Sequence, residues 1–171
     1  MPRRTRNPII APDSSPARWA LFGYVAGFVA LAGAVNGIVF ASGAGAWSAS
    51  LASPRFAPPG GVIGAVWVII FALMAVALWR VRREPPSSRR SAATAALLIQ
   101  YAVNLAFPFY ALLPRSVLAG FVGTVVSAAI AWIVLVVVFR ASRVAAAFVA
   151  PLCGWLIYAG FLSFELYRLN G

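Results

Sequence analysis

The sequence has no histidine, one cysteine and very few acidic residues, and each scarcity excludes a kind of chemistry. Without histidine, the usual ligand of zinc, copper and haem iron is missing. Cys153 alone cannot form an intramolecular disulfide or a thiolate metal cluster. The acids are Asp13, Glu84 and Glu165, so a catalytic pair of carboxylates has few candidate members. The composition therefore supports metal-dependent and acid–base catalysis poorly.

Charged residues of either sign are scarce compared with hydrophobic residues. Charged residues make up 10% of the 171 residues and hydrophobic residues 63%, whereas a soluble domain carries about 25% charged residues. This composition excludes a soluble globular domain. Five apolar runs are long enough to span a bilayer, and their lack of strand-like alternation predicts helices. We expect an all-α integral membrane protein with a five-transmembrane-helix bundle, its spans at residues 19–40, 61–81, 91–113, 116–139 and 144–166.

All fourteen basic residues are arginines, and five spans would divide them unequally between the two sides of the membrane. Eleven fall on one side, namely Arg3, Arg4, Arg6, Arg18, Arg80, Arg82, Arg83, Arg89, Arg90, Arg140 and Arg143; three fall on the other, namely Arg55, Arg115 and Arg168. Cytoplasmic loops carry an excess of Lys and Arg, so we expect a cytoplasmic N-terminus and an external C-terminus. Residues 1–17 are predicted to be a basic, disordered cytoplasmic tail, and residues 18–171 the membrane domain. Because no soluble basic domain remains, the expected partner is the lipid bilayer and not nucleic acid.

The longest connection, residues 41–60, reads ASGAGAWSASLASPRFAPPG and lies on the arginine-poor side. Its Gly, Ser and Pro content predicts a loop and not a sixth span. Two interpretations stay open. The segment is a lid over the mouth of the bundle, with Trp47, Phe56, Pro58 and Pro59 as its contact residues, or it is an ordinary interfacial loop with an aromatic anchor.

Amide side chains inside apolar spans require an explanation, because each must find a hydrogen-bond partner away from water. Gln100 and Asn104 are four residues apart and share one helical face, with Phe107 a further turn along. They either join helices by hydrogen bonds or form a polar patch on the wall of an internal cavity. Both interpretations stay open from the sequence.

Tryptophans fall at span ends and inside spans. Trp19 and Trp79 lie at span ends, as expected of an interfacial aromatic belt. Trp67, Trp132 and Trp155 lie inside spans, where an indole N–H favours a side facing protein or ligand. Trp67 and Trp155 each belong to an apolar stripe at helical spacing, which is either packed core or the wall of a binding site.

Small residues and one acid complete the candidate features. Gly23, Gly27, Gly33 and Gly37 in the first span, and Gly120, Gly123 and Ser127 in the fourth, permit close helix approach within one bundle or in a homodimer. Glu165 is the only acid inside a predicted span, and Arg168 three residues later favours a local ion pair over a proton-coupling site. No catalytic set is visible, so the residues favour a binding protein, although an enzyme is not excluded.

Three motifs in order along the chain resemble those of one membrane family. The segment from Trp47 to Met74 reads W-x3-L-x2-P-x-F-x-P-P-x7-W-x6-M, the third span contains Q-x3-N, and the fifth contains P-x3-W-x3-A with a closing L-N. These motifs resemble the TspO/MBR family, the tryptophan-rich sensory proteins related to the mitochondrial translocator protein. The sequence departs from the family pattern at Phe71 and Phe107, where Tyr and Trp are common.

The resemblance implies a ligand site inside the five-helix bundle, closed by the loop after the first helix. Family members bind porphyrins and related tetrapyrroles, sterols or benzodiazepine-type ligands. Matching positions implicate Trp67, Phe71, Asn104, Phe107, Trp155, Ala159 and Leu162. No cofactor is required, and a bound porphyrin or haem would have no histidine ligand. The expected function is a receptor or carrier of tetrapyrroles or similar flat apolar ligands with a transport, regulatory or stress-sensing role; the alternatives are a light-dependent porphyrin-degrading enzyme and a small efflux transporter.

Overall fold

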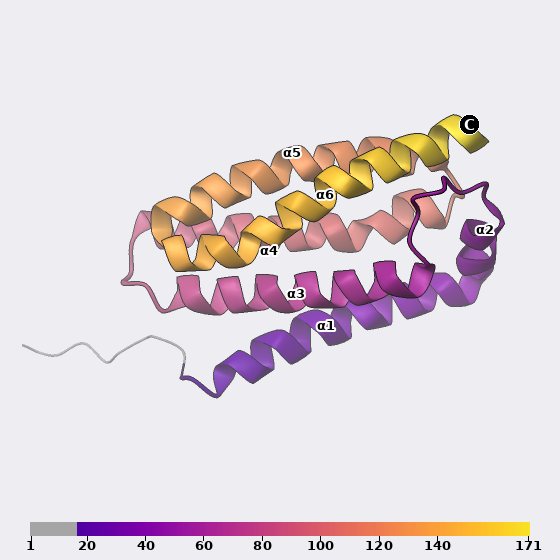
Figure 1. Cartoon of the computed structure of the whole chain (residues 1–171). Helices are drawn as coiled ribbons and strands as arrows, with labels where there is room; N and C mark the ends of the chain where they lie inside the picture. Colours follow the sequence, from indigo (N-terminus) through magenta and orange to yellow (C-terminus); the bar gives the residue numbers. More distant parts are fainter. Residues whose placement is uncertain (1–16) are drawn as a thin grey trace, which may run out of the picture.

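The computed structural model describes residues 17–171, and the predicted N-terminal tail lies outside the described residues except for Ala17. All regular structure in this part of the chain is helical (Figure 1). In order, the elements are α1 (Ala20–Val39), a π-helical turn η1 (Phe40–Ala44), α2 (Gly45–Ser50), α3 (Gly60–Arg82), α4 (Ser88–Phe107), a second π-helical turn η2 (Pro108–Leu112), α5 (Val117–Ala141) and α6 (Arg143–Asn170).

Three of the long helices begin at a serine that caps the first turn. The hydroxyls of Ser87, Ser116 and Ser142 accept the backbone N–H three residues later, at 3.2, 3.1 and 3.4 Å, before α4, α5 and α6. Such a cap satisfies one of the N–H groups that have no partner within the helix. The apolar runs of the sequence are therefore divided at these serines.

The segment after the first span differs from the prediction in its first half. Residues 41–50 were expected in a loop, but the helix continues through η1 into α2 and ends at Ser50. Gly43 has φ +87°, a conformation that glycine adopts without steric cost, so the chain bends there while its neighbours stay helical. The true connection is residues 51–59, called here the cap segment.

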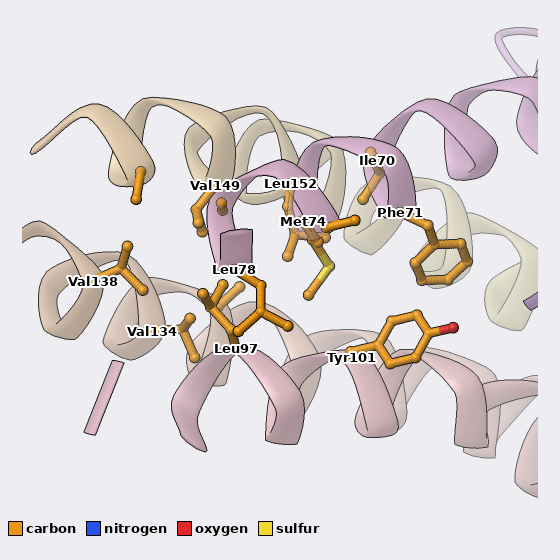
Figure 2. Packing of buried hydrophobic residues seen from close by; sticks show 14 of the residues in the cluster. Ile70, Phe71, Met74, Leu78, Leu97, Tyr101, Val134, Val138, Val149 and Leu152 are labelled. Atoms are coloured by element: carbon orange, nitrogen blue, oxygen red, sulfur yellow. The ribbon is translucent and has the colours of Figure 1, made fainter. Parts of the chain in front are cut away.

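The helices form one bundle around α3. α3 packs against α1, α4 and α6, while α5 packs against α4 and α6. One end of the bundle, called here the arginine end, holds the start of α1 and the α3–α4 and α5–α6 connections; the other, called here the cap end, holds α2, the cap segment and the C-terminus (Figure 1). Figure 2 shows the buried core between them, where Met74 and Leu78 of α3 meet Leu97 of α4 and Leu152 of α6.

The outside of the bundle carries many large apolar side chains. Large side chains such as Ile133, Ile69 and Phe161 are more than half exposed, whereas Gln100 is fully buried. An apolar surface of this extent is stable only in lipid. Five segments are long and apolar enough to cross a membrane, namely Ala20–Ser50, Gly60–Arg82, Ser88–Leu112, Val117–Ala141 and Arg143–Asn170. The five-span, all-helical prediction is confirmed, and the chain is an integral multi-pass membrane protein.

Candidate functional site

A connected group of aromatic rings, called here the aromatic cluster, joins four elements of the bundle. Trp67 of α3 lies edge-on to Trp155 of α6, with ring centroids 6.4 Å apart and planes at 87°. Trp67 also contacts Phe71 at 5.4 Å, and Trp155 contacts Tyr158 at 5.3 Å. Phe71 in turn meets Tyr101 of α4, which stacks on Phe28 of α1 at 4.1 Å. Figure 2 shows the rings of Phe71 and Tyr101, which meet edge to face.

Helical periodicity places these rings. Trp67 and Phe71 are four residues apart on α3, and Trp155 and Tyr158 three apart on α6, so each pair lies on one helical face. Edge-to-face aromatic pairs add about 0.5 to 1.5 kcal/mol beyond their buried area. The cluster therefore fixes which faces of α3 and α6 meet, and it also provides an aromatic surface that a flat ligand could share.

Trp155 carries an unpaired polar group. Its indole Nε1 is buried and has no hydrogen-bond partner within the described residues 17–171. A buried donor without an acceptor costs roughly 1 to 3 kcal/mol. Such a cost is removed when a ligand or a water molecule supplies an acceptor.

The cap segment is held against α6 near the aromatic cluster. The Tyr158 hydroxyl donates to the Phe56 carbonyl at 3.1 Å, and the two rings meet edge to face at 6.3 Å. Asn170 accepts from the Ala52 N–H at 2.8 Å and donates to the Ala52 carbonyl at 2.9 Å. The segment that carries Phe56, Pro58 and Pro59 is thus held to α6 at Ala52 and at Phe56, while Trp47 lies half-buried on α2.

Asn104 belongs to a buried hydrogen-bond network that joins α4 to α5. Its Oδ1 accepts from Gln100 Nε2 at 3.2 Å and from the Ser127 hydroxyl at 2.8 Å, and Gln100 Nε2 also donates to Ser127 Oγ at 3.0 Å. The interhelical bonds that one interpretation expected are present. Among the described residues, the one acceptor that Asn104 Nδ2 meets is the weak acceptor Met74 Sδ, at 3.9 Å. Its contact with a ligand stays a prediction.

The structure brings together some of the predicted site residues and separates others. Trp67, Phe71 and Trp155 meet in the aromatic cluster, and Ala159 and Leu162 continue the Trp155 face of α6 towards the cap end. Phe107 points elsewhere: its ring contacts Tyr110 of η2 at 5.6 Å and packs beside Gly120 of α5.

Two tryptophans lie differently from what the sequence indicated. Trp132 is 49% exposed, so the expectation that it faces protein or ligand is wrong; it faces outwards from α5. Trp79 is only 8% exposed, whereas a belt position was expected. Its Nε1 donates to the Ala17 carbonyl at 3.4 Å and Arg83 lies over its ring at 4.8 Å, so Trp79 holds the start of the first span.

Three members of the cluster were missed from the sequence, namely Phe28, Tyr101 and Tyr158. Spacing could have found two of them, since Tyr158 follows Trp155 by three residues and Tyr101 precedes Asn104 by three. Tyr101 also donates to the Phe28 carbonyl at 2.7 Å, which ties α4 to α1. Phe28 had no signal, because the residues around it in α1 are almost all apolar or small and mark no preferred face.

The remaining charged pair behaves as predicted. Arg168 NH2 lies 2.6 Å from Glu165 Oε2 on the last turns of α6, which confirms a local ion pair. Among residues 17–171, no three His, Cys, Asp or Glu side chains come together as metal ligands. The aromatic cluster itself offers aromatic rings for stacking, apolar contacts and the indole N–H of Trp155.

The fold and the cluster define a class: five-helix membrane proteins with tryptophans packed between the helices. Residues 24–168 match the TspO/MBR family, and the chain belongs to it. Over 124 residues, which cover 72% of this chain and 80% of the relative, it is 30% identical to the uncharacterized membrane protein YtaB of Bacillus subtilis. Over the same shares, it is 25% and 23% identical to proteins named tryptophan-rich protein TspO from Archaeoglobus fulgidus and Bacillus cereus.

Proposed function

We propose that this protein is a receptor or carrier that binds tetrapyrroles, or similar flat apolar ligands, at the aromatic cluster. Family membership supports the class of protein, and the unpaired Nε1 of Trp155 beside Trp67 supports the position of the site. A flat macrocycle gains from apolar burial and from offset stacking on such rings. An acceptor on the ligand would satisfy the indole N–H.

Access to this site is through the cap end. Because Tyr158 and Asn170 hold the cap segment by only a few hydrogen bonds, the segment can separate from α6 without disturbing the core below it. The rings of Trp67 and Trp155 are in direct contact, so a ligand must part them. This assigns the cap segment the role of a lid. Ala159 and Leu162 then line the path, and Asn104 Nδ2 offers a polar contact at its base.

Ligand binding at this site depends on the ring system and not on a bound metal. The sequence has no histidine to ligate a haem iron. We therefore expect metal-free porphyrin to bind about as tightly as haem, with sterols as a further ligand class.

Orientation follows from the arginines. Arg18, Arg80, Arg82, Arg83, Arg89, Arg90, Arg140 and Arg143 gather at one end of the bundle, and Arg55, Arg115 and Arg168 at the other. We propose that the arginine end faces the cytoplasm and that the cap end and C-terminus face outwards, as the positive-inside rule requires.

The decisive experiment is a titration of the purified protein in lipid nanodiscs with protoporphyrin IX, followed by quenching of tryptophan fluorescence. The Trp155→Ala change removes one wall and should weaken binding by roughly tenfold or more, since about 1.4 kcal/mol corresponds to tenfold. The Trp155→Phe change keeps an aromatic ring but removes the N–H, and should have a smaller effect.

The matched control is Trp132→Ala, which removes an indole that faces outwards. It should leave the dissociation constant within twofold of wild type. Equal weakening by Trp155→Ala and Trp132→Ala, with both variants folded, would place the ligand elsewhere. Saturable binding with a porphyrin spectrum that changes under illumination would favour the degrading enzyme over a receptor.

A further inference from the structure

The arginine end contains an open cleft between the start of α4 and the end of α5. Its outer part has a volume of about 390 Å³ and is lined by the α3–α4 connection together with Ser88, Arg89, Arg90 and Arg140. A second part of about 570 Å³ shares Ser88, Arg89 and Arg140 and continues to Ala92 and Val137. The aromatic cluster contributes to neither part, so this cleft is separate from the site proposed above.

The cleft carries an excess of positive charge. Arg90 is engaged, because its NH1 donates to the Glu84 carbonyl at 3.0 Å and so holds the α3–α4 connection. Arg89 and Arg140 are exposed, and neither makes an ion pair or a side-chain hydrogen bond with any of residues 17–171. Glu84 is the one acid in the lining, against three arginines. Two guanidinium groups are thus available to an anion.

The backbone of α4 adds to the positive charge of the cleft. α4 begins at the cleft, and its first turn contains no acid that would offset the positive end of the helix dipole. Two neighbouring arginines are already used elsewhere: Arg83 lies over Trp79 at 4.8 Å, and Arg143 lies over Phe139 at 5.5 Å. The cleft therefore combines uncommitted positive charge with the N-terminus of a helix.

The deeper part of the cleft is apolar. Ala92 lies one turn beyond Ser88 on α4, and Val137 lies three residues before Arg140 on α5, so both stand one turn deeper in the membrane than the arginines. Ile133, one turn further along α5, is 64% exposed. A free phosphate ion would make no favourable contact with this apolar part of the cleft. A phospholipid would, because its acyl chain continues from its phosphate in the same direction.

We propose that this cleft binds an anionic phospholipid, with the phosphate between Arg89 and Arg140 and an acyl chain along Ala92 and Val137. Arginine favours phosphate because its planar fork donates two parallel hydrogen bonds. Basic pockets between transmembrane helices at the cytoplasmic surface are suited to anionic headgroups. Binding here is independent of the ligand site at the cap end.

The test uses native mass spectrometry of the full chain in detergent, titrated with phosphatidylglycerol and, separately, with phosphatidylcholine. Wild type should bind one phosphatidylglycerol at least fivefold more tightly than phosphatidylcholine. Arg89→Gln with Arg140→Gln should weaken phosphatidylglycerol binding by roughly tenfold. The matched control, Arg18→Gln with Arg82→Gln, removes the same charge from exposed positions at the same end and should keep the preference.

A second variant separates the lipid from a free anion. Ala92→Phe fills the apolar part without changing charge, and it should weaken phosphatidylglycerol binding at least fivefold while leaving both arginines in place. The proposal is overturned by equal loss in the two arginine double variants, by no effect of Ala92→Phe, by displacement of the lipid with millimolar inorganic phosphate, or by no phosphatidylglycerol preference in wild type. Circular dichroism and elution volume establish that each variant is folded.

Discussion

At the scale of single residues, the interior is organised by a few polar side chains in an apolar setting. Gln100, Asn104 and Ser127 satisfy one another across α4 and α5 because lipid offers them no alternative partner. Thr94 and Gln100 show the limit of this satisfaction, since Thr94 Oγ1 and Gln100 Oε1 are buried and have no partner within residues 17–171. Their contributions to stability should therefore differ from that of Ser127.

This difference predicts the effect of two conservative substitutions. Ser127→Ala removes a donor to Asn104 and an acceptor from Gln100, and should lower the free energy of unfolding by about 0.6 to 1.7 kcal/mol, the range for interhelical bonds in membranes. Thr94→Ala removes a hydroxyl that has no partner among the described residues, and it should lower the free energy of unfolding by less than Ser127→Ala does. The measurement is unfolding in mixed micelles with increasing SDS. An equal loss for both would mean that the network contributes no net stability.

At the scale of elements, glycines in α1 and α5 serve different contacts. A Cβ on Gly123 of α5 would collide with the Tyr110 ring of η2, and one on Gly120 would touch Ala111 and Phe107. The α5 stripe therefore packs within one chain. A Cβ on Gly23, Gly27, Gly33 or Gly37 of α1 would meet nothing within 4 Å, so the α1 stripe lies on the open surface of the bundle.

We propose that a second copy of the chain packs on the α1 stripe, and that the two stripes respond differently to leucine. Gly123→Leu displaces Tyr110 from its edge contact with Phe107 and should destabilise the monomer by about 1 to 3 kcal/mol, the usual cost of overpacking. Gly27→Leu should leave monomer stability unchanged but reduce the dimer fraction, because small residues allow close helix approach.

Monomer stability is measured by thermal unfolding, and the dimer fraction by cross-linking and by light scattering in detergent. If the dimer fraction of Gly27→Leu is unchanged, α1 does not form the interface between copies of the chain. An unchanged melting temperature in Gly123→Leu would mean that Tyr110 has another place to pack.

At the scale of the whole molecule, the two ends of the bundle have opposite characters. The arginine end holds most of the positive charge and the cleft that we propose for a lipid, and the cap end holds the cap segment, which contacts Tyr158 of the aromatic cluster. The division matches the electrostatics of a membrane, whose cytoplasmic surface is negative. The two proposed sites, one for ligand entry and one for a lipid, therefore lie towards opposite ends of the bundle.

Single cysteines report this orientation. With Cys153 replaced by serine, Ser88→Cys at the arginine end should be shielded from an impermeant thiol reagent in intact cells, whereas Ser48→Cys on α2 should react; both side chains are exposed on the protein. Permeabilised cells provide the control, because both positions should then react. The reverse labelling in intact cells would invert the topology.

The sequence by itself determined the membrane class, the five spans and the grouping of the arginines. These are properties of composition over windows of about 20 residues, and a bilayer imposes them on any chain because backbone polar groups must pair within each span. Local ion pairing at Glu165 and Arg168 was also accessible, since residues three apart on a helix are neighbours.

Only the tertiary structure decided which faces of the helices meet. Trp132 faces outwards and Trp79 inwards, and Phe107 turns towards η2. Tyr101 and Tyr158 complete the aromatic cluster. Residues 41–50 continue as helix past Gly43. In a soluble protein, the polar face of a helix faces water, so the opposite, apolar face is known to be the buried one. Here lipid and core are equally apolar, so hydropathy does not distinguish them, and packing between particular side chains selects the inward face.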